Sequence, residues 1–171
     1  MEVEVKAKAS DLALVEKKLK GKGARLVKKV VQNADYYLPE NFKRFSKNGP
    51  FPVRLRREGN KTFLTYKKQS ANQGAWLEFE TAIGNPDQME KILRALGFKK
   101  AFSVNKTRKE YSLANVNYCL DDVKGLGKFV EVEAFSSQGK KTLAKLKKLL
   151  HSLSLFETTG KGYVQMLAEK R

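Results

Sequence analysis

Charged residues occupy every second position in five segments of this chain, and each segment carries mainly one sign of charge. Side chains two residues apart share one face of a β-strand, so each segment predicts a strand with a strongly charged face. The alternating pairs are Glu2 and Glu4 (followed by Lys6), Arg54 and Arg56, Glu78 and Glu80, Lys106 and Arg108, and Glu131 and Glu133. This pattern restricts the chain to a β-rich fold in which one face of the sheet collects charge.

Eight segments with this or a similar alternation predict strands, and three amphipathic segments predict helices. The expected strands are 2–8, 28–38, 53–58, 62–68, 75–81, 104–112, 117–122 and 128–134. The expected helices run from Ser10 to Lys20, from Asn85 to Leu96 and from Lys140 to Leu153, with Ser10 and Asn85 as N-caps. Gly59-Asn60 between two strand segments fits a tight hairpin, which favours an antiparallel sheet. We therefore expect an α+β fold, built as one domain over residues 1–171, with a closed or strongly curved sheet.

The charged faces admit two interpretations. They can be the solvent-exposed side of an antiparallel sheet whose other side covers a core, which is the commonest origin of such alternation. Alternatively, they line the inside of a closed barrel, and the three helices cover its apolar outer face. The sorting of charges by strand and the supply of three amphipathic helices favour the barrel. Arginines and lysines buried in this way need compensation from the glutamates and from a bound polyanion.

The overall charge indicates a partner that is negatively charged. Lys and Arg number 35 against 18 Asp and Glu, which gives a formal net charge of +17. Guanidinium and ammonium groups bind phosphate oxygens, while converging carboxylates bind Mg²⁺ or Mn²⁺. Cys119 and His151 are the only cysteine and histidine, which excludes intramolecular disulfides, multi-Cys zinc sites and metal centres built on several histidines. The residues alone thus predict an enzyme or binder of a phosphate chain.

The chain carries no sequence signal for a membrane or for secretion. No uninterrupted apolar run approaches the ~20 residues of a membrane-spanning helix. The N-terminal segment is acidic and alternating, whereas a secretory signal begins with positive charge and an apolar stretch. We expect a cytoplasmic protein without a membrane partner.

Several motifs occur in a fixed order along the chain. Residues 2–6 read EVEVK, 53–56 read VRLR, 64–67 read LTYK, 104–108 read VNKTR, and 161–167 read KGYVQML. In this order they resemble the CYTH superfamily, also called triphosphate tunnel metalloenzymes, whose signature is ExExK and which includes class IV adenylyl cyclases and thiamine triphosphatases. The resemblance covers essentially the whole chain. It implies a closed eight-stranded antiparallel β-barrel that forms a tunnel, with helices packed outside.

The resemblance also implies a role for each motif residue. Basic side chains would hold the triphosphate: Lys6, Arg54, Arg56, Lys67, Lys106, Arg108 and Lys161. Carboxylates would hold the divalent metal, Mg²⁺ or Mn²⁺: Glu2, Glu4, Glu131 and Glu133, with Asp121, Glu78 and Glu80 as further acidic candidates. Lys6, Lys67 and Glu4 are the catalytic candidates. The terminal segment departs from the family pattern at Gly162, where a Ser is usual, and at Gln165, where a Glu is usual.

We expect metal-dependent hydrolysis of a nucleoside, thiamine or inorganic triphosphate, in which water attacks the terminal phosphorus. The first alternative is a class IV adenylyl cyclase, which would convert ATP into cyclic AMP and pyrophosphate in the same tunnel. The sequence begins directly at the ExExK strand, without the His-Phe element that precedes it in some of the family's cyclases, and this favours hydrolysis.

A second alternative is a non-enzymatic binder of polyphosphate or RNA. Its support is the surplus of lysines outside the motifs, in segments such as 17–22 and 140–148. No RNA-reading motif or aromatic stacking platform accompanies these lysines in the sequence, so nucleic acid is not favoured as the partner. The choice among ATP, thiamine triphosphate and tripolyphosphate, and the formation of a homodimer, stay open at this point.

Overall fold

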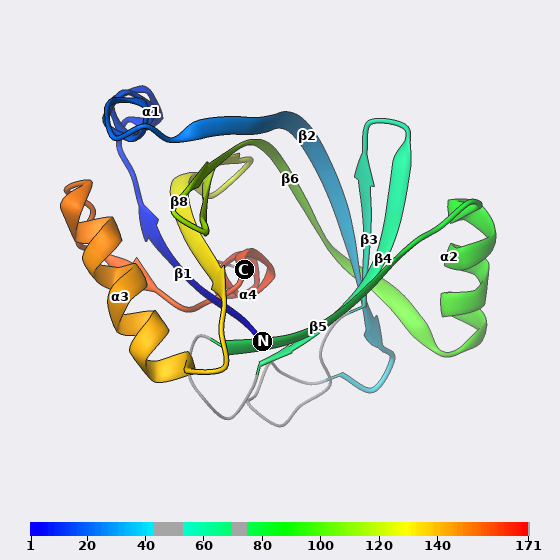
Figure 1. Ribbon diagram of the computed structural model, residues 1–171. Helices are drawn as coiled ribbons and strands as arrows, with labels where there is room; N and C mark the ends of the chain where they lie inside the picture. Colours follow the sequence, from blue (N-terminus) through cyan, green and yellow to red (C-terminus); the bar gives the residue numbers. More distant parts are fainter. Residues whose placement is uncertain (43–52, 70–74, 171) are drawn as a thin grey trace.

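The protein is described by a computed structural model that covers residues 1–42, 53–69 and 75–170 (Figure 1). Nine strands and four helices lie in this part of the chain. The strands are β1 (Glu2–Lys8), β2 (Arg25–Pro39), β3 (Val53–Glu58), β4 (Lys61–Gln69), β5 (Ala75–Ala82), β6 (Phe98–Leu113), β7 (Val116–Val123), β8 (Gly127–Phe135) and β9 (Thr158–Thr159). The helices are α1 (Leu12–Gly21), α2 (Pro86–Ala95), α3 (Gly139–Ser152) and α4 (Tyr163–Ala168).

Eight of the strands form a closed antiparallel barrel. Their order is β5-β4-β3-β2-β6-β7-β8-β1, and β1 pairs again with β5, where Glu2 lies opposite Trp76. The short strand β9 adds to the other side of β1, with Thr159 opposite Lys6. Closure removes the free edges of the sheet and creates an inside face and an outside face. The predicted α+β fold with a closed eight-stranded barrel is confirmed.

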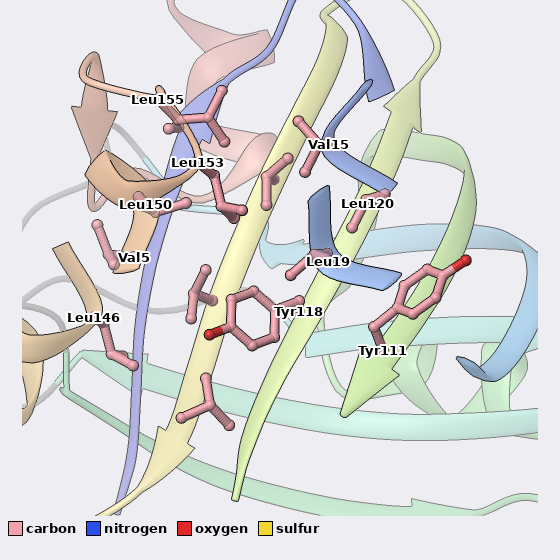
Figure 2. Close-up of a cluster of buried hydrophobic side chains, with 14 of the residues drawn as sticks. Val5, Val15, Leu19, Tyr111, Tyr118, Leu120, Leu146, Leu150, Leu153 and Leu155 are labelled. Atoms are coloured by element: carbon pink, nitrogen blue, oxygen red, sulfur yellow. The ribbon is translucent and has the colours of Figure 1, made fainter. Parts of the chain in front are cut away.

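The apolar faces of β1, β7 and β8 point outward, and helices α1 and α3 cover them (Figure 2). Val5 of β1 packs there with Val15 and Leu19 of α1 and with Leu146 and Leu150 of α3. Burial of these side chains is the main stabilising contribution of this layer, since removing apolar surface from water yields roughly 25 cal/mol per Å². The intervening residues of the strands consequently face inward. Of the two interpretations of the alternating charges, the barrel interior is therefore correct.

The helix boundaries follow local capping chemistry, with one correction to the sequence prediction. Asp11, rather than Ser10, caps α1, because its carboxylate accepts hydrogen bonds from the backbone N–H groups of Ala13 at 2.8 Å and Leu14 at 3.3 Å. Asn85 caps α2 as expected, accepting from the N–H of Gln88 at 3.1 Å. Gly97 follows that helix with a φ of +80°, a conformation that glycine adopts without strain.

Helix α4 and strand β9 were not predicted. Tyr163 and Val164 of α4 pack with Ala34, Val104 and Phe129, apolar residues of three barrel strands. Figure 1 shows α4 within the outline of the barrel. The C-terminal segment thereby forms part of the wall of the interior. None of the helices in the described ranges has the length and apolar character that crossing a bilayer requires.

Candidate active site in the barrel interior

The barrel interior holds a cavity of about 870 Å³, walled by the charged faces of the strands. Nine basic and six acidic side chains of the described residues line it. Every basic residue of the predicted site lies on this wall: Lys6, Arg54, Arg56, Lys67, Lys106, Arg108 and Lys161. Five of the predicted acidic residues do so as well: Glu2, Glu4, Glu78, Glu131 and Glu133. Glu80 and Asp121 are not among the residues that line the cavity, but both contact arginines that do: Arg56 donates to Glu80, and Arg108 donates to Asp121.

Strand register sets opposite charges beside each other across the barrel wall. Residues directly opposite on antiparallel strands have Cβ atoms roughly 5 Å apart, so their side chains interact. The register pairs are Lys6 with Glu131, Lys67 with Glu78, and Arg108 with Asp121. The sequence alternation therefore places each charge on the inside face, and the register chooses its partner.

Lys67 on β4 lies at the centre of a group of carboxylates. Its Nζ is 2.6 Å from a carboxylate oxygen of Glu2, 2.7 Å from Glu4 and 3.1 Å from Glu78. Burial acts to lower the pKa of Lys67, but the carboxylates outweigh burial and hold this pKa well above its usual value. Lys67 is therefore a fixed positive charge.

Lys6 on β1 is fully buried and links two further carboxylates. Its Nζ lies 3.1 Å from Glu4 and 3.2 Å from Glu131. Burial alone would lower the pKa of Lys6, yet Glu4 and Glu131 raise it above the usual range. For Glu131, burial acts to raise the pKa, but Lys6 and Arg108 outweigh it and hold this pKa well below its usual value. An ion pair of this kind persists only with such close geometry, because the desolvation of each charge costs several kcal/mol.

Asp121 on β7 contacts both basic side chains of the predicted site on β6, Lys106 and Arg108. It is completely buried and accepts two hydrogen bonds from the Arg108 guanidinium, at 2.6 and 2.5 Å. Lys106 lies 3.0 Å from the same carboxylate, and the Tyr163 hydroxyl donates to it at 2.8 Å. Burial, with a smaller effect from the neighbouring Arg108, lowers the pKa of Lys106. Asp121 thus aims Arg108 and Lys106 at the cavity and holds α4 against the barrel.

A second network fixes the arginines of β3. Arg56 donates to Glu80 at 2.8 and 3.0 Å and pairs with Glu58. Arg54 donates to the Thr65 hydroxyl at 3.1 Å, and that hydroxyl donates to Glu80 at 2.6 Å. Both guanidinium groups are therefore oriented before any ligand binds.

Three carboxylates form a candidate metal site. Glu2, Glu4 and Glu133 each have an oxygen within 4.8 Å of the others. Burial, together with the charges of Glu131 and Glu2, raises the pKa of Glu133 to about 8. A divalent cation bound between these carboxylates would offset their mutual repulsion. Carboxylate oxygens are the ligands that Mg²⁺ and Mn²⁺ prefer, so the residues present fit such an ion.

Lys161 differs from the other basic residues of the wall. It lies between β9 and α4, with about half of its side chain exposed, and its Nζ is 2.8 Å from Glu169. It lines the edge of the cavity. The inward-pointing lysines and arginines, by contrast, pair with carboxylates of the barrel.

Some site residues escaped the sequence prediction although a signal for them existed. Glu58 lies two positions after Arg56, and Thr65 two positions before Lys67, so the same alternation extended by one step identifies both. Tyr163 follows the terminal KG pair and lies near the ammonium groups of Lys6 and Lys106, with the Nζ atoms 5.5 and 5.0 Å from the ring centre. Its inward position depends on the packing of α4 and could not be read from periodicity.

Comparisons with known proteins agree with this geometry. The model of the CYTH domain family matches residues 1–162. A Methanocaldococcus jannaschii protein named "Putative adenylate cyclase MJ0240" is 30% identical over 173 residues, which cover 97% of this chain and 98% of that protein. The structure of the PH1819 protein of Pyrococcus horikoshii superposes with a TM-score of 0.86 at 29% identity and full coverage of both chains. The PH1012 protein of the same organism superposes with a TM-score of 0.83 at 26% identity, covering 96% of this chain and 98% of its own.

Proposed function

The chain belongs to the CYTH domain family, and we propose that it is a divalent-metal-dependent enzyme that hydrolyses a triphosphate inside its barrel. The observation that carries the proposal is the cavity wall, where oriented guanidinium and ammonium groups face a cluster of three carboxylates. The negative charge of a triphosphate complements the basic groups, and the positive charge of its metal complements the carboxylates. We further propose that residues 1–171 act as a single tunnel domain.

Basic side chains from several strands bind the phosphate chain in this proposal. Arg54 and Arg56 come from β3, and Lys106 and Arg108 from β6. Guanidinium forks bind phosphate oxygens in a bidentate manner, and lysines add point charges. Because these groups are already held by Glu80 and Asp121, little reorganisation is needed when charge develops on the phosphate oxygens.

Glu2, Glu4 and Glu133 would hold Mg²⁺ or Mn²⁺, which supplies neutralisation of the phosphate charge when bound. Lys6 and Lys67 retain their protons, since neighbouring carboxylates raise the pKa of each. We therefore assign these two lysines to charge neutralisation rather than to proton abstraction. Glu4 contacts both lysines and thereby sets their positions. Phosphoryl transfer to water then relies on positioning and electrostatics.

Adenylate cyclase activity is the second candidate, and the name of the Methanocaldococcus relative favours it. Cyclisation requires, in addition to the phosphate site, a pocket that orients the ribose and base of ATP. Fifteen of the thirty described residues that line the cavity are charged, and we assign these to the phosphate chain and its metal. Hydrolysis needs only the groups already described, so we place it first.

The test is a product analysis. Purified, metal-stripped protein is incubated with ATP, thiamine triphosphate or inorganic tripolyphosphate, with and without Mg²⁺ or Mn²⁺, and all products are separated by chromatography. We expect metal-dependent release of orthophosphate. Cyclic AMP with pyrophosphate from ATP would make the cyclase the correct function, and no turnover of any substrate would contradict both candidates.

The matched control uses two isosteric substitutions. Glu4→Gln removes a carboxylate from the candidate metal site, and we expect turnover to fall by roughly 100-fold or more. Glu90→Gln removes a carboxylate from α2, outside the cavity, and should leave turnover unchanged. Equal activity in the two variants would show that the Glu4 carboxylate is not needed for turnover.

A further inference from the structure

Helices α2 and α3 differ sharply in charge. Helix α2 carries two acidic and two basic residues, and Glu90 pairs with Arg94 at 2.7 Å. Helix α3 carries five lysines and no acidic residue. The chain contains no Asp or Glu anywhere between Phe135 and Phe156. All five lysines of α3 are exposed: Lys140, Lys141, Lys145, Lys147 and Lys148.

The lysines of α3 do not serve the stability of the helix. Lys141 and Lys145 are four residues apart, and Lys145 and Lys148 three apart, so like charges lie side by side along one stripe. Like charges at these spacings destabilise a helix. Lys140 and Lys141 also lie in the first turn, where the helix dipole disfavours positive charge, and no side chain caps this end. This arrangement is unfavourable in isolation and becomes favourable when a polyanion lies along it.

Two exposed aromatic rings flank α3. Phe135 precedes the helix by four residues with 81% of its surface exposed, and Phe156 follows the helix by four residues with 68% exposed. The Phe156 ring lies 5.4 Å from the ring of His151 on α3. Between the two phenylalanines runs a helix about 21 Å long, at 1.5 Å per residue. Figure 1 shows α3 on the outside of the barrel. Phe135 lies opposite Glu2 of β1, on the same face of β8 as Glu131 and Glu133, so its ring belongs to the inward-facing side of that strand.

We propose that the α3 surface, consisting of Lys140, Lys141, Lys145, Lys148 and Phe156, binds single-stranded nucleic acid. The lysines contact the phosphates, and the Phe156 ring stacks on a base, which is the combination used by proteins that bind single strands. A duplex keeps its base faces inside, so an exposed ring selects an unpaired base. The inference goes beyond the proposed triphosphatase and does not depend on it, because the α3 surface lies outside the barrel.

Fluorescence anisotropy with a labelled 20-nucleotide oligo-uridylate carrying a 5′-hydroxyl tests the proposal. A variant with Lys140, Lys141, Lys145 and Lys148 replaced by Gln keeps Lys147, which lines the cavity. The variant and its control both leave the basic residues of the barrel interior unchanged, so any binding inside the barrel is the same in all the proteins compared. We expect the affinity of the variant at 100 mM salt to fall at least tenfold. The slope of log affinity against log salt should flatten by up to ~2.8, since each phosphate contact contributes ~0.7.

The matched control replaces four exposed lysines elsewhere, Lys61, Lys91, Lys124 and Lys128, and changes the net charge equally. Its affinity should fall less than threefold. An equal loss in both variants would overturn the proposal, because diffuse charge would then explain the binding.

The variant Phe156→Ala distinguishes binding of nucleic acid from binding of inorganic polyphosphate. We expect the affinity for oligo-uridylate to fall about fivefold or more, since stacking contributes roughly 1–3 kcal/mol per base. Affinity for labelled polyphosphate of similar charge should not change. If Phe156→Ala leaves both affinities unchanged and polyphosphate binds as tightly as RNA, the ligand is a phosphate chain and the nucleic-acid proposal is wrong.

Discussion

Asp121 has no exposed surface. Its carboxylate accepts hydrogen bonds from Arg108 and Tyr163 and forms an ion pair with Lys106. Replacing Asp121 with Asn removes the counter-charge that Lys106 and Arg108 share, and leaves Arg108 with Glu131, at 3.1 Å, as its remaining ion pair among the described residues. Breaking one partner of a buried pair typically costs about 3–5 kcal/mol. We expect Asp121→Asn to lower the free energy of unfolding by this amount in urea denaturation, and to raise KM for triphosphate because Arg108 loses its orientation.

Asp122 provides the control at the neighbouring position. It is exposed on the same strand, so Asp122→Asn should change the unfolding free energy by less than about 0.5 kcal/mol. If both variants are equally stable, Asp121 does not organise the wall of the cavity. Asp121 also shows a limit of sequence reasoning: the resemblance to the family identified it as an acidic candidate, but not that Arg108 and Tyr163 already donate hydrogen bonds to its oxygens.

At the scale of single elements, α1 is joined to β6 by Glu16. Its carboxylate accepts from the Tyr111 hydroxyl at 2.5 Å and pairs with Lys109 at 2.6 Å and Lys20 at 2.9 Å. Hydrogen bonds from Lys109, Tyr111 and Lys20 lower the pKa of Glu16 to about 2 from an ordinary 4.5. A lowered native pKa contributes stability that is complete above pH 4.5 and is lost as the pH falls toward 2.

We expect Glu16→Gln to lower the unfolding free energy by about 1–2 kcal/mol at pH 7, because part of the carboxylate is exposed to solvent. The difference from the unmodified protein should shrink below pH 4.5 and vanish near pH 2. Thermal denaturation at pH 7, 4 and 2.5 measures it. A difference independent of pH would show that packing, and not the charge of Glu16, joins α1 to the barrel.

Elements differ in how far the sequence predicts them. The strands of the barrel and the helices α1, α2 and α3 follow from periods of two and of about 3.6 residues that persist over six or more positions. β9 spans two residues and α4 six, too few for either period to register. Their conformation depends instead on tertiary contacts, such as the burial of Tyr163 and Val164. Capping residues are equally local, which is why adjacent Ser10 and Asp11 could not be separated by sequence.

For the whole molecule, the site exists because the sheet closes. Glu2 and Glu4 come from β1, Lys67 from β4 and Glu133 from β8, and the pairing of β1 with β5 and β8 makes them neighbours. The sequence predicts which residues share a face but not which way that face points. The three amphipathic helices and the resemblance to a tunnel family indicated that the charged faces point into the barrel. The particular ion pairs, such as Lys67 with Glu2, result from closure and register and required the structure.

Closure of the barrel also predicts that the proposed metal and the proposed triphosphate affect each other's binding. Without ligand, Lys67 forms ion pairs with Glu2, Glu4 and Glu78, while Lys6 forms ion pairs with Glu4 and Glu131. A triphosphate that draws these lysines away leaves carboxylates without partners, and a divalent cation then replaces the lost positive charge. Each ligand should therefore strengthen the binding of the other. The two factors are equal because coupling between sites is reciprocal, and we expect each to be about tenfold.

Calorimetric titration of tripolyphosphate in the presence and absence of Mg²⁺ measures this coupling. Because Mg²⁺ also associates with tripolyphosphate in solution, the comparison is made with Glu133→Gln, which meets the same solution complex but lacks one carboxylate of the candidate metal site. We expect the variant to retain binding of tripolyphosphate alone and to lose most of the tenfold gain. If the gain is equal in both proteins, the coupling arises in solution, and the carboxylates of the barrel do not hold the metal.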